Sequence, residues 1–183
     1  NDTPDPTPTG LSMLVGRVLG DRYRIENVVN AGANTVITEA IDVDGHRPVI
    51  VKIVRPELAV TTAFRRAFRR QVEVAMSLNH PNIASVRGWG ETELDGEATL
   101  YWVVEYLGGG SLRDLFDRGR LLAPSQALVV GLEACRALEA AHGRGIIHRD
   151  MKPSNVLVRE DDGAATVMDF GIAKMTNSTR LTA

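Results

Sequence analysis

The sequence changes its pattern at three consecutive glycines, Gly108, Gly109 and Gly110, and this change most limits the folds open to the chain. Before the glycines, runs rich in valine and isoleucine predict β-strands, with one stretch of helical period. After them the dominant pattern is helical. We therefore predict an α+β fold in which a flexible joint at the glycines separates a sheet-rich half from a helix-rich half. The expected strands of the first half are residues 23–30, 36–42, 47–54, 85–93 and 99–106, with a helix over 61–78.

The second half is predicted to hold a long helix over residues 124–142, preceded by a short capped helix that starts after residue 111. Leu128, Leu132 and Cys135 share one face of the long helix. Such a face usually packs against a core, so Cys135 is expected to be a core thiol and not a nucleophile.

Composition excludes several classes of structure for these 183 residues, among them membrane-spanning helices and disulfide-rich folds. With 183 residues, 44% of them hydrophobic, the chain can bury a core as one domain or two small lobes. A net charge of -2 gives no reason to expect nucleic acid as a partner. Cys135 is the single cysteine, which favours a reducing, cytoplasmic location, and no apolar run reaches the roughly 20 residues of a membrane span. Residues 1–17 form a Pro/Thr-rich segment that we expect to be a disordered tail.

The strongest chemical signal is the run His-Arg-Asp-Met-Lys-Pro-Ser-Asn at residues 148–155. Phosphoryl transfer from ATP to a hydroxyl needs a carboxylate for the hydroxyl proton, a cation near the phosphate and oxygen ligands for a metal ion. Asp150, Lys152 and Asn155 supply these three groups within six residues. A second run, Asp169-Phe-Gly, follows an expected strand and adds another carboxylate for magnesium.

The two runs, in this order and separation, resemble the catalytic loop and the D-F-G triplet of eukaryotic-type (Hanks-type) serine/threonine protein kinases. The resemblance extends from about residue 18 to 175, and the scarcity of lysine relative to arginine suggests a bacterial member. It implies a two-lobed kinase fold with a five-stranded antiparallel sheet and one helix in the N-lobe, residues 18–107, and a partial, mainly helical C-lobe, residues 108–183. It also implies ATP and Mg2+ (or Mn2+) as cofactors and a Ser/Thr protein as substrate.

The resemblance assigns a role to each candidate site residue. Asp150 and Lys152 would be catalytic, and Asn155 and Asp169 would hold the metal. The residues implied in ATP binding lie along the first half and one strand of the second: Gly32, Ile37, Ile50, Lys52, Glu105, Leu107 and Leu157.

Three departures from the family pattern lie in the first half. The glycine-rich loop reads Asn-Ala-Gly-Ala-Asn-Thr at residues 30–35 and keeps only Gly32. The position of the helical glutamate that pairs with the ATP-binding lysine holds Gln71, and Glu73 lies about 200° around the helix from it. Ile50 replaces a small alanine. These changes leave a pseudokinase, a nucleotide-binding or scaffold module, as the alternative to a slow or conditional kinase.

The last residues, 176–183, resemble the start of an activation segment, and the family continues with further helices. We expect the chain to be a kinase domain truncated after the D-F-G triplet. On its own it is then expected to lack kinase activity and to self-associate through apolar faces of the helix at 124–142.

Overall fold

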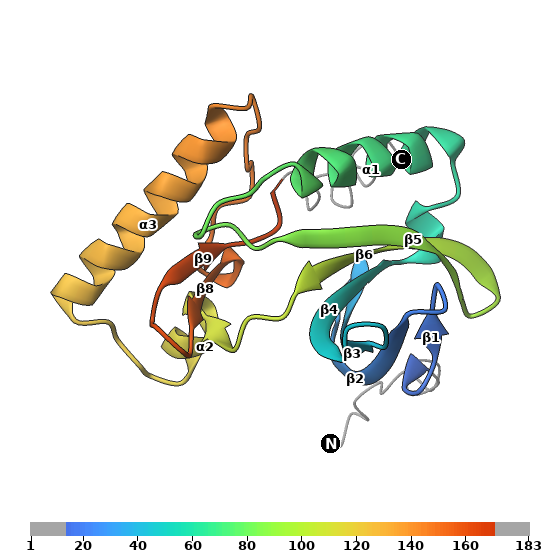
Figure 1. Ribbon diagram of the computed structural model, residues 1–183, viewed down its shortest axis with the longest axis horizontal. Coiled ribbons are helices and arrows are strands. Elements are labelled where there is room, and N and C mark those ends of the chain that lie inside the picture. Colours follow the sequence, from blue (N-terminus) through green and yellow to red (C-terminus); the bar gives the residue numbers. More distant parts are fainter. Residues whose placement is uncertain (1–13, 171–183) are drawn as a thin grey trace, which may run out of the picture.

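The structure is a computed structural model that describes residues 14–170. It contains an antiparallel six-stranded sheet with helix α1 on one face, and a smaller three-stranded sheet flanked by helices α2 and α3 (Figure 1). The larger sheet has the strand order β1-β2-β3-β4-β6-β5 and the smaller one β7-β8-β9. The bounds of the strands are β1 Val18–Leu19, β2 Tyr23–Ala31, β3 Thr35–Asp42, β4 Arg47–Val54, β5 Val86–Leu94, β6 Glu97–Glu105, β7 Gly109–Ser111, β8 Val156–Arg159 and β9 Ala165–Val167.

In the larger sheet, successive residues of a strand point to opposite faces, and the more apolar face is buried. In β3 the burial alternates strictly, with Val36, Thr38 and Ala40 inside. Strand β6 is buried on both faces over most of its length, since one face packs on the core that includes Leu14 and the other packs against α1. The five strands predicted for the first half correspond to β2, β3, β4, β5 and β6. The two-residue strand β1 adds a sixth at the edge, and the packed Leu14 differs from the disordered tail expected over residues 1–17.

Helix α1, Thr62–Met76, begins at the N-cap Thr61, whose hydroxyl accepts a hydrogen bond from the backbone of Phe64. Its inner face buries Phe68, Val72 and Ala75 against β5 and β6. A buried phenylalanine of this kind contributes about 1.5–3 kcal/mol, which fixes the face that α1 turns toward the sheet.

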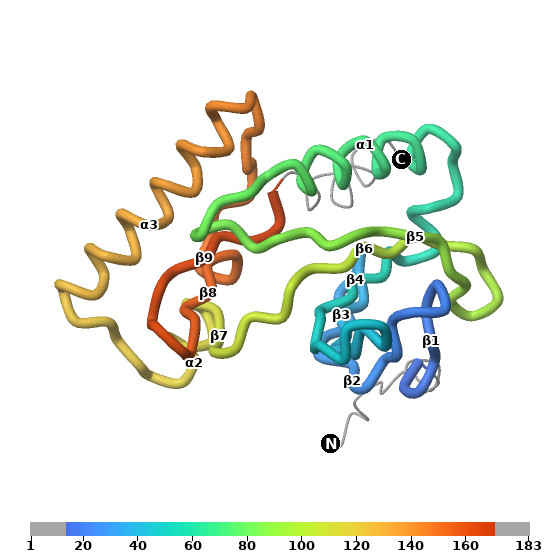
Figure 2. The backbone as a smooth tube through the Cα atoms, viewed as in Figure 1, coloured from blue at the N-terminus to red at the C-terminus, as the bar shows by residue number. Residues whose placement is uncertain are grey.

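The glycine run at 108–110 lies where the chain passes from one sheet to the other (Figure 2). The expected flexible joint is in part a strand, because β7 pairs with β8 through Gly109 opposite Arg159 and Ser111 opposite Leu157. Ser111 then caps α2, Leu112–Asp117, and Asp114 returns the bond to the Ser111 backbone, as the predicted capping box requires. Two 3-10 turns, Pro56–Leu58 and Pro153–Asn155, complete the elements.

Helix α3, Pro124–His142, has the predicted bounds but not the predicted inner face. Val130, Ala137 and Ala141 are buried, whereas Leu128 and Leu132 are 75% and 53% exposed and Cys135 is exposed. The prediction of a core thiol at Cys135 is wrong within this structure. The reason is that the small alanines, not the larger leucines, allow the close approach of α3 to β9 and Phe170.

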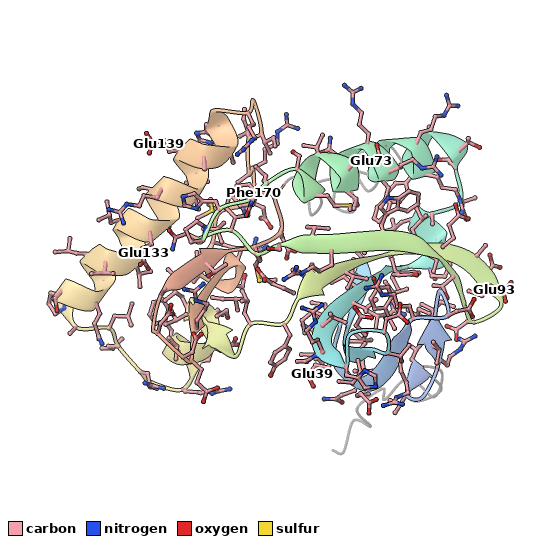
Figure 3. The ribbon with its side chains drawn as sticks, in the orientation of Figure 1. Glu39, Glu73, Glu93, Glu133, Glu139 and Phe170 are labelled. Atoms are coloured by element: carbon pink, nitrogen blue, oxygen red, sulfur yellow. The ribbon has the colours of Figure 1, made fainter. Side chains whose placement is uncertain are left out.

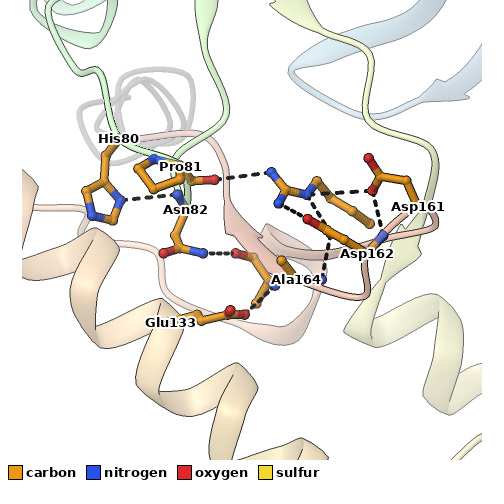
Figure 4. A network of polar contacts seen from close by, with 9 residues as sticks. His80, Pro81, Asn82, Glu133, Asp161, Asp162 and Ala164 are labelled. Carbon is orange, nitrogen blue, oxygen red and sulfur yellow. Dashed lines mark hydrogen bonds and ion pairs between the residues drawn. The ribbon is translucent and has the colours of Figure 1, made fainter.

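The loop between α1 and β5 reaches across to the smaller sheet (Figure 4). The Asn82 side chain donates to the Ala165 carbonyl at 2.8 Å, and the Ala165 N–H donates to Glu133 of α3 at 2.7 Å. Backbone bonds from Ala84 to Val167 and from Val167 to Asn82 extend the contact. The α1–β5 loop, helix α3 and strand β9 are thus hydrogen-bonded to one another, and β9 leads directly to Asp169.

Among residues 14–170, no helix is long and apolar enough to cross a membrane. The D-F-G glycine and the expected activation segment at 176–183 lie outside the described residues.

Candidate functional site

A cleft of about 200 Å3 between the two sheets gathers most of the residues that the sequence singled out. Its lining comes from the β2–β3 turn, from β3, β4 and β6, and from the loops around residues 150 and 169. A larger hollow of about 790 Å3, beneath β7 and α2, contains none of the predicted site residues. The cleft is lined by Gly32, Ala33, Asn34, Thr35, Ile37, Lys52, Trp102, Asp150, Lys152, Asn155 and Asp169.

Asp150 lies in this cleft with one carboxylate oxygen bound by two donors. Its Oδ2 accepts a hydrogen bond from Asn155 Nδ2 at 3.0 Å and an ion-paired contact from Lys152 Nζ at 2.8 Å. Among the described residues no donor reaches Oδ1. Burial raises the pKa of the Asp150 carboxyl, but the Lys152 and Asn155 hydrogen bonds and the nearby positive charges outweigh burial, so that the pKa is lowered overall. Asp150 is therefore ionised and has one oxygen free to accept a proton.

His148 positions the loop that carries Asp150. Its Nδ1 accepts from the Asp150 N–H at 3.2 Å, and its Nε2 lies 2.7 Å from the Met168 carbonyl. Since the first contact requires an acceptor, the proton belongs on Nε2, which donates to Met168. The ring also contacts Phe170 edge-on, with centroids 4.7 Å apart. One buried imidazole thus links Asp150 to the segment that presents Asp169.

Lys52 projects from β4 into the cleft and is only 3% exposed. Its Nζ contacts both oxygens of Asp169, at 2.6 and 2.5 Å. Losing one member of such a buried pair costs about 3–5 kcal/mol, because the other charge remains without a partner. Both Asp169 and Arg149 adopt left-handed backbone, with φ of 66° and 68°, which is uncommon for residues other than glycine and concentrates at functional sites.

Gln71 does not take part in this arrangement. It lies half-buried on α1, while Glu73 is exposed on the same helix (Figure 3). The relative placement of the two side chains agrees with the helical register expected from the sequence. Within residues 14–170 no hydrogen bond joins Gln71 to Lys52, and Gln71 is not among the cleft-lining residues.

The turn at Gly32 closes one side of the cleft. The Gly32 N–H donates to the Thr35 carbonyl at 2.9 Å, and Arg55, just after β4, donates through Nε to the Gly32 carbonyl at 3.3 Å. The Arg55 N–H also donates to the Asn34 carbonyl at 2.9 Å. The turn is therefore tied to β4 even though it lacks the two other glycines of the family pattern.

Four of the predicted ATP-binding residues lie outside the lining of this cleft. Ile50 and Leu107 are half-buried against the core under α1, and Leu157 is half-buried in β8. The Glu105 carboxylate accepts from the Ser85 N–H at 2.7 Å and pairs with Arg87 at 3.1 Å. Its side chain is thus occupied within the protein.

Asn155 and Asp169 have the chemistry that magnesium prefers. Both Asn155 hydrogen bonds to Asp150 use Nδ2, so its Oδ1 remains an oxygen ligand, and Asp169 supplies a carboxylate. Magnesium commonly takes one or two protein oxygens and completes its shell with phosphates and water. The residues present fit the ion on these terms. The structure shows no group of three or more acidic, His or Cys side chains in residues 14–170 that would hold a metal by itself.

Trp102 is a cleft residue that the sequence analysis missed. It stands directly opposite Lys52 in the β4–β6 register, on the face of the sheet that α1 covers. The signal was present in part, because Trp102 is a large aromatic residue in the expected strand 99–106, but its place on the same face as Lys52 follows only from the β4–β6 register.

Comparisons with known proteins agree with this geometry. The model of the protein kinase domain matches residues 23–183. The chain is 39% identical over 165 residues to serine/threonine-protein kinase PknB of Mycobacterium leprae, and 40% identical over 166 residues to the probable serine/threonine-protein kinase SCO3848 of Streptomyces coelicolor. These matches cover 90% and 91% of the chain but only 26% and 24% of the relatives. The chain thus spans about a quarter of the length of the curated relatives it matches.

Solved structures give the same result for the fold. The PknI kinase domain of Mycobacterium tuberculosis superposes with a TM-score of 0.71 at 28% identity, covering 87% of this chain and 62% of that one. Rad53 1-466 in complex with AMP-PNP superposes with a TM-score of 0.70 at 28% identity, covering 82% of this chain and 38% of that one.

Proposed function

Because the chain belongs to the protein kinase family, we propose that it forms the catalytic part of an ATP-dependent protein serine/threonine kinase. The observation that carries the proposal is the ionised Asp150 in a cleft with two lysines, its Oδ2 bound by Asn155 and Lys152 and its Oδ1 open. This arrangement holds a base in place beside cations that suit phosphate oxygens.

In the proposed reaction a serine or threonine hydroxyl of the substrate approaches Asp150 Oδ1. The hydroxyl oxygen forms a bond to the γ-phosphorus of ATP as the bond to the bridging oxygen breaks, and the proton passes to Asp150 while ADP leaves. Lys152, whose Nζ is 2.8 Å from Asp150, neutralises charge on the transferred group. Lys52 leaves Asp169 to bind the α- and β-phosphates. The metal, Mg2+ or Mn2+, would be held by Asn155 and Asp169 and would offset phosphate charge.

The adenine site is proposed next to this cleft. Ile37 lines the cleft directly. Ile50 and Leu157 would contact the adenine ring, and the backbone of Glu105 and Leu107 would bond its edge, with Gly32 over the phosphates. The surrounding lobes are proposed as residues 18–107 and 108–183.

The kinase proposal is favoured over a pseudokinase because the matched relatives are named serine/threonine kinases and because the base, both lysines and both metal ligands are present. Lys152 two residues after Asp150 supports Ser/Thr as acceptor. We propose a cytoplasmic location, in line with the single cysteine, and a protein substrate without nucleic acid.

The test is a phosphotransfer assay on the complete kinase domain with labelled ATP and a generic Ser/Thr protein substrate. Transfer is expected with magnesium and is expected to disappear in Asp150→Asn. ATP should also raise the melting temperature, and the increase should require magnesium. A metal-independent increase without transfer would instead identify a nucleotide-binding pseudokinase, and transfer by Asp150→Asn would exclude Asp150 as the base.

A further inference from the structure

Trp102 is a large aromatic side chain buried in the core between β6 and α1. It is 3% exposed, and its indole Nε1 has no hydrogen-bond partner among residues 14–170. A buried tryptophan usually finds a partner for this N–H. Hydrogen bonding therefore does not explain why a tryptophan occupies this position.

The ring of Trp102 instead contacts the charge that the site depends on. Lys52 Nζ lies 6.0 Å from the ring centroid, within the range of a cation–π interaction, and both groups are shielded from water. The same ring meets Phe68 of α1 edge-on, with centroids 5.8 Å apart. Trp102 thus lies between α1 and Lys52, and it lines the cleft that contains Asp150 and Asp169.

No carboxylate on α1 holds Lys52. Gln71 forms no bond to Lys52 within the described part of the chain, and Glu73 is exposed. Helix α1 is connected to Lys52 through Phe68, one turn before Gln71, and through Trp102. The contacts of Trp102 with Phe68 and with Lys52 therefore connect the helix to the lysine, where an ion pair would otherwise do so.

We propose that Trp102 is a positioning residue that orients Lys52 toward the nucleotide phosphates and couples it to α1 through Phe68, in place of a carboxylate on the helix. The inference rests on the proposed kinase function. The face of the indole would hold the ammonium at the cleft if Asp169 binds a metal, because a cation–π contact leaves the N–H donors of Lys52 free for phosphate oxygens.

The kinetic test compares two substitutions in the complete kinase domain. Trp102→Phe keeps an aromatic face, whereas Trp102→Leu keeps only bulk. Trp102→Leu is expected to lower kcat/KM for ATP by about tenfold or more, while Trp102→Phe stays within about threefold of the original. Melting temperatures of both variants report folding. Equal losses in both variants, or none in Trp102→Leu, would reduce Trp102 to a packing residue.

A double variant tests the coupling itself. Gln71→Glu is expected to change kcat/KM little when Trp102 is present, and to recover at least about threefold of the loss in the Trp102→Leu background. The smaller leucine leaves room for Lys52 to meet the new carboxylate. Additive effects of the two substitutions would overturn the proposal.

A spectroscopic test separates this inference from the proposed function, because it needs no phosphotransfer. The chain has two tryptophans, so Trp89→Phe leaves Trp102 as the single indole and Trp102→Phe leaves Trp89. Lys52→Met is expected to change the emission of the Trp102-only protein and to leave that of the Trp89-only protein unchanged. An unchanged Trp102 spectrum would refute the contact even in an active kinase, and a changed one would support it even if no transfer is found.

Discussion

The two carboxylate oxygens of Asp150 have different roles: Oδ2 is held by neighbouring donors, and Oδ1 is open to a substrate. Oδ2 receives Lys152 and Asn155, and these donors, against the effect of burial, hold its pKa below the ordinary value. The Asp150 carboxyl thus stays ionised down to a lower pH than an ordinary aspartate does. Acid conditions reduce the activity of such a base only when the pH approaches this lowered pKa.

Removing the Lys152 ammonium should move this acid limit. In Lys152→Gln the pKa of Asp150 rises, because a hydrogen bond and a positive charge that favour the carboxylate are lost. The acidic limb of the kcat/KM–pH profile is therefore expected at higher pH, along with a lower maximum. Lys152→Arg is the control, since it keeps the charge and should keep the limb near its original place. A limb that moves to lower pH in Lys152→Gln would contradict this account.

Gly109 is a second residue whose identity follows from its surroundings. Its φ is 99°, and a Cβ there would collide with the Val158 carbonyl across the β7–β8 pair. Gly96 has a similar φ of 82° but nothing near its Cβ position.

Alanine at these two glycines should separate backbone strain from collision. Gly96→Ala is expected to lower the free energy of unfolding by about 1–2 kcal/mol, from left-handed backbone alone. Gly109→Ala should cost at least about 1 kcal/mol more, because β7 must also move away from β8. Urea denaturation of both variants measures the difference, and equal costs would argue against the close β7–β8 contact.

At the scale of residues, the sequence predicted which side chains line the cleft but not the backbone conformations and contacts that position them. Lys52, Asp150, Asn155 and Asp169 come together as expected. The positive φ of Asp169 and the Lys52–Trp102 contact were not predicted, because both depend on how distant segments pack and neither follows from local pattern.

At the scale of elements, α1 carries the clearest test of register. Gln71 is half-buried and Glu73 faces solvent, so the two substitutions should differ. Gln71→Glu is expected to preserve or raise autophosphorylation, and Glu73→Gln to change it by less than about twofold, since an exposed charge without a buried partner contributes little. Initial rates of autophosphorylation measure both. Equal losses would indicate that Glu73 is the working partner of Lys52 in a rotated helix.

The long elements and the capped helix α2 were predictable from the sequence, whereas strands β1 and β7 were not. Pro124 and His142 bound α3 as expected, and residues 47–54 form β4, because caps, prolines and apolar periods act over many residues. Strands β1 and β7 have two and three residues and no period of their own. Pairing with a neighbouring strand creates them. The inner face of α3 was wrong for a related reason, since alanines gave a weaker signal than the leucines beside them.

At the scale of the molecule, the exposed leucines of α3 predict how the isolated 183-residue chain behaves. Leu128 and Leu132 leave apolar area in water at about 25 cal/mol per Å2, which association would recover. Size-exclusion chromatography is expected to show an associated species. Replacing both leucines by Gln should shift it toward monomer, whereas Val60→Gln, at an exposed site just before α1, should not. A chain that elutes as a monomer would refute the prediction.

The bonds of the α1–β5 loop to β9 add a second border between the two halves, besides the glycine run. Residues 78–84 precede the glycine run by more than twenty positions, yet Leu78 and Ile83 share a core with α3, Val167 and Phe170. Ala75, in the last turn of α1, packs instead with Phe68 and Trp102 on the larger sheet. The segment between α1 and β5 therefore belongs to the helical half although it comes early in the sequence. Any movement of one half against the other would have to bend the chain beside this segment as well as at the glycines.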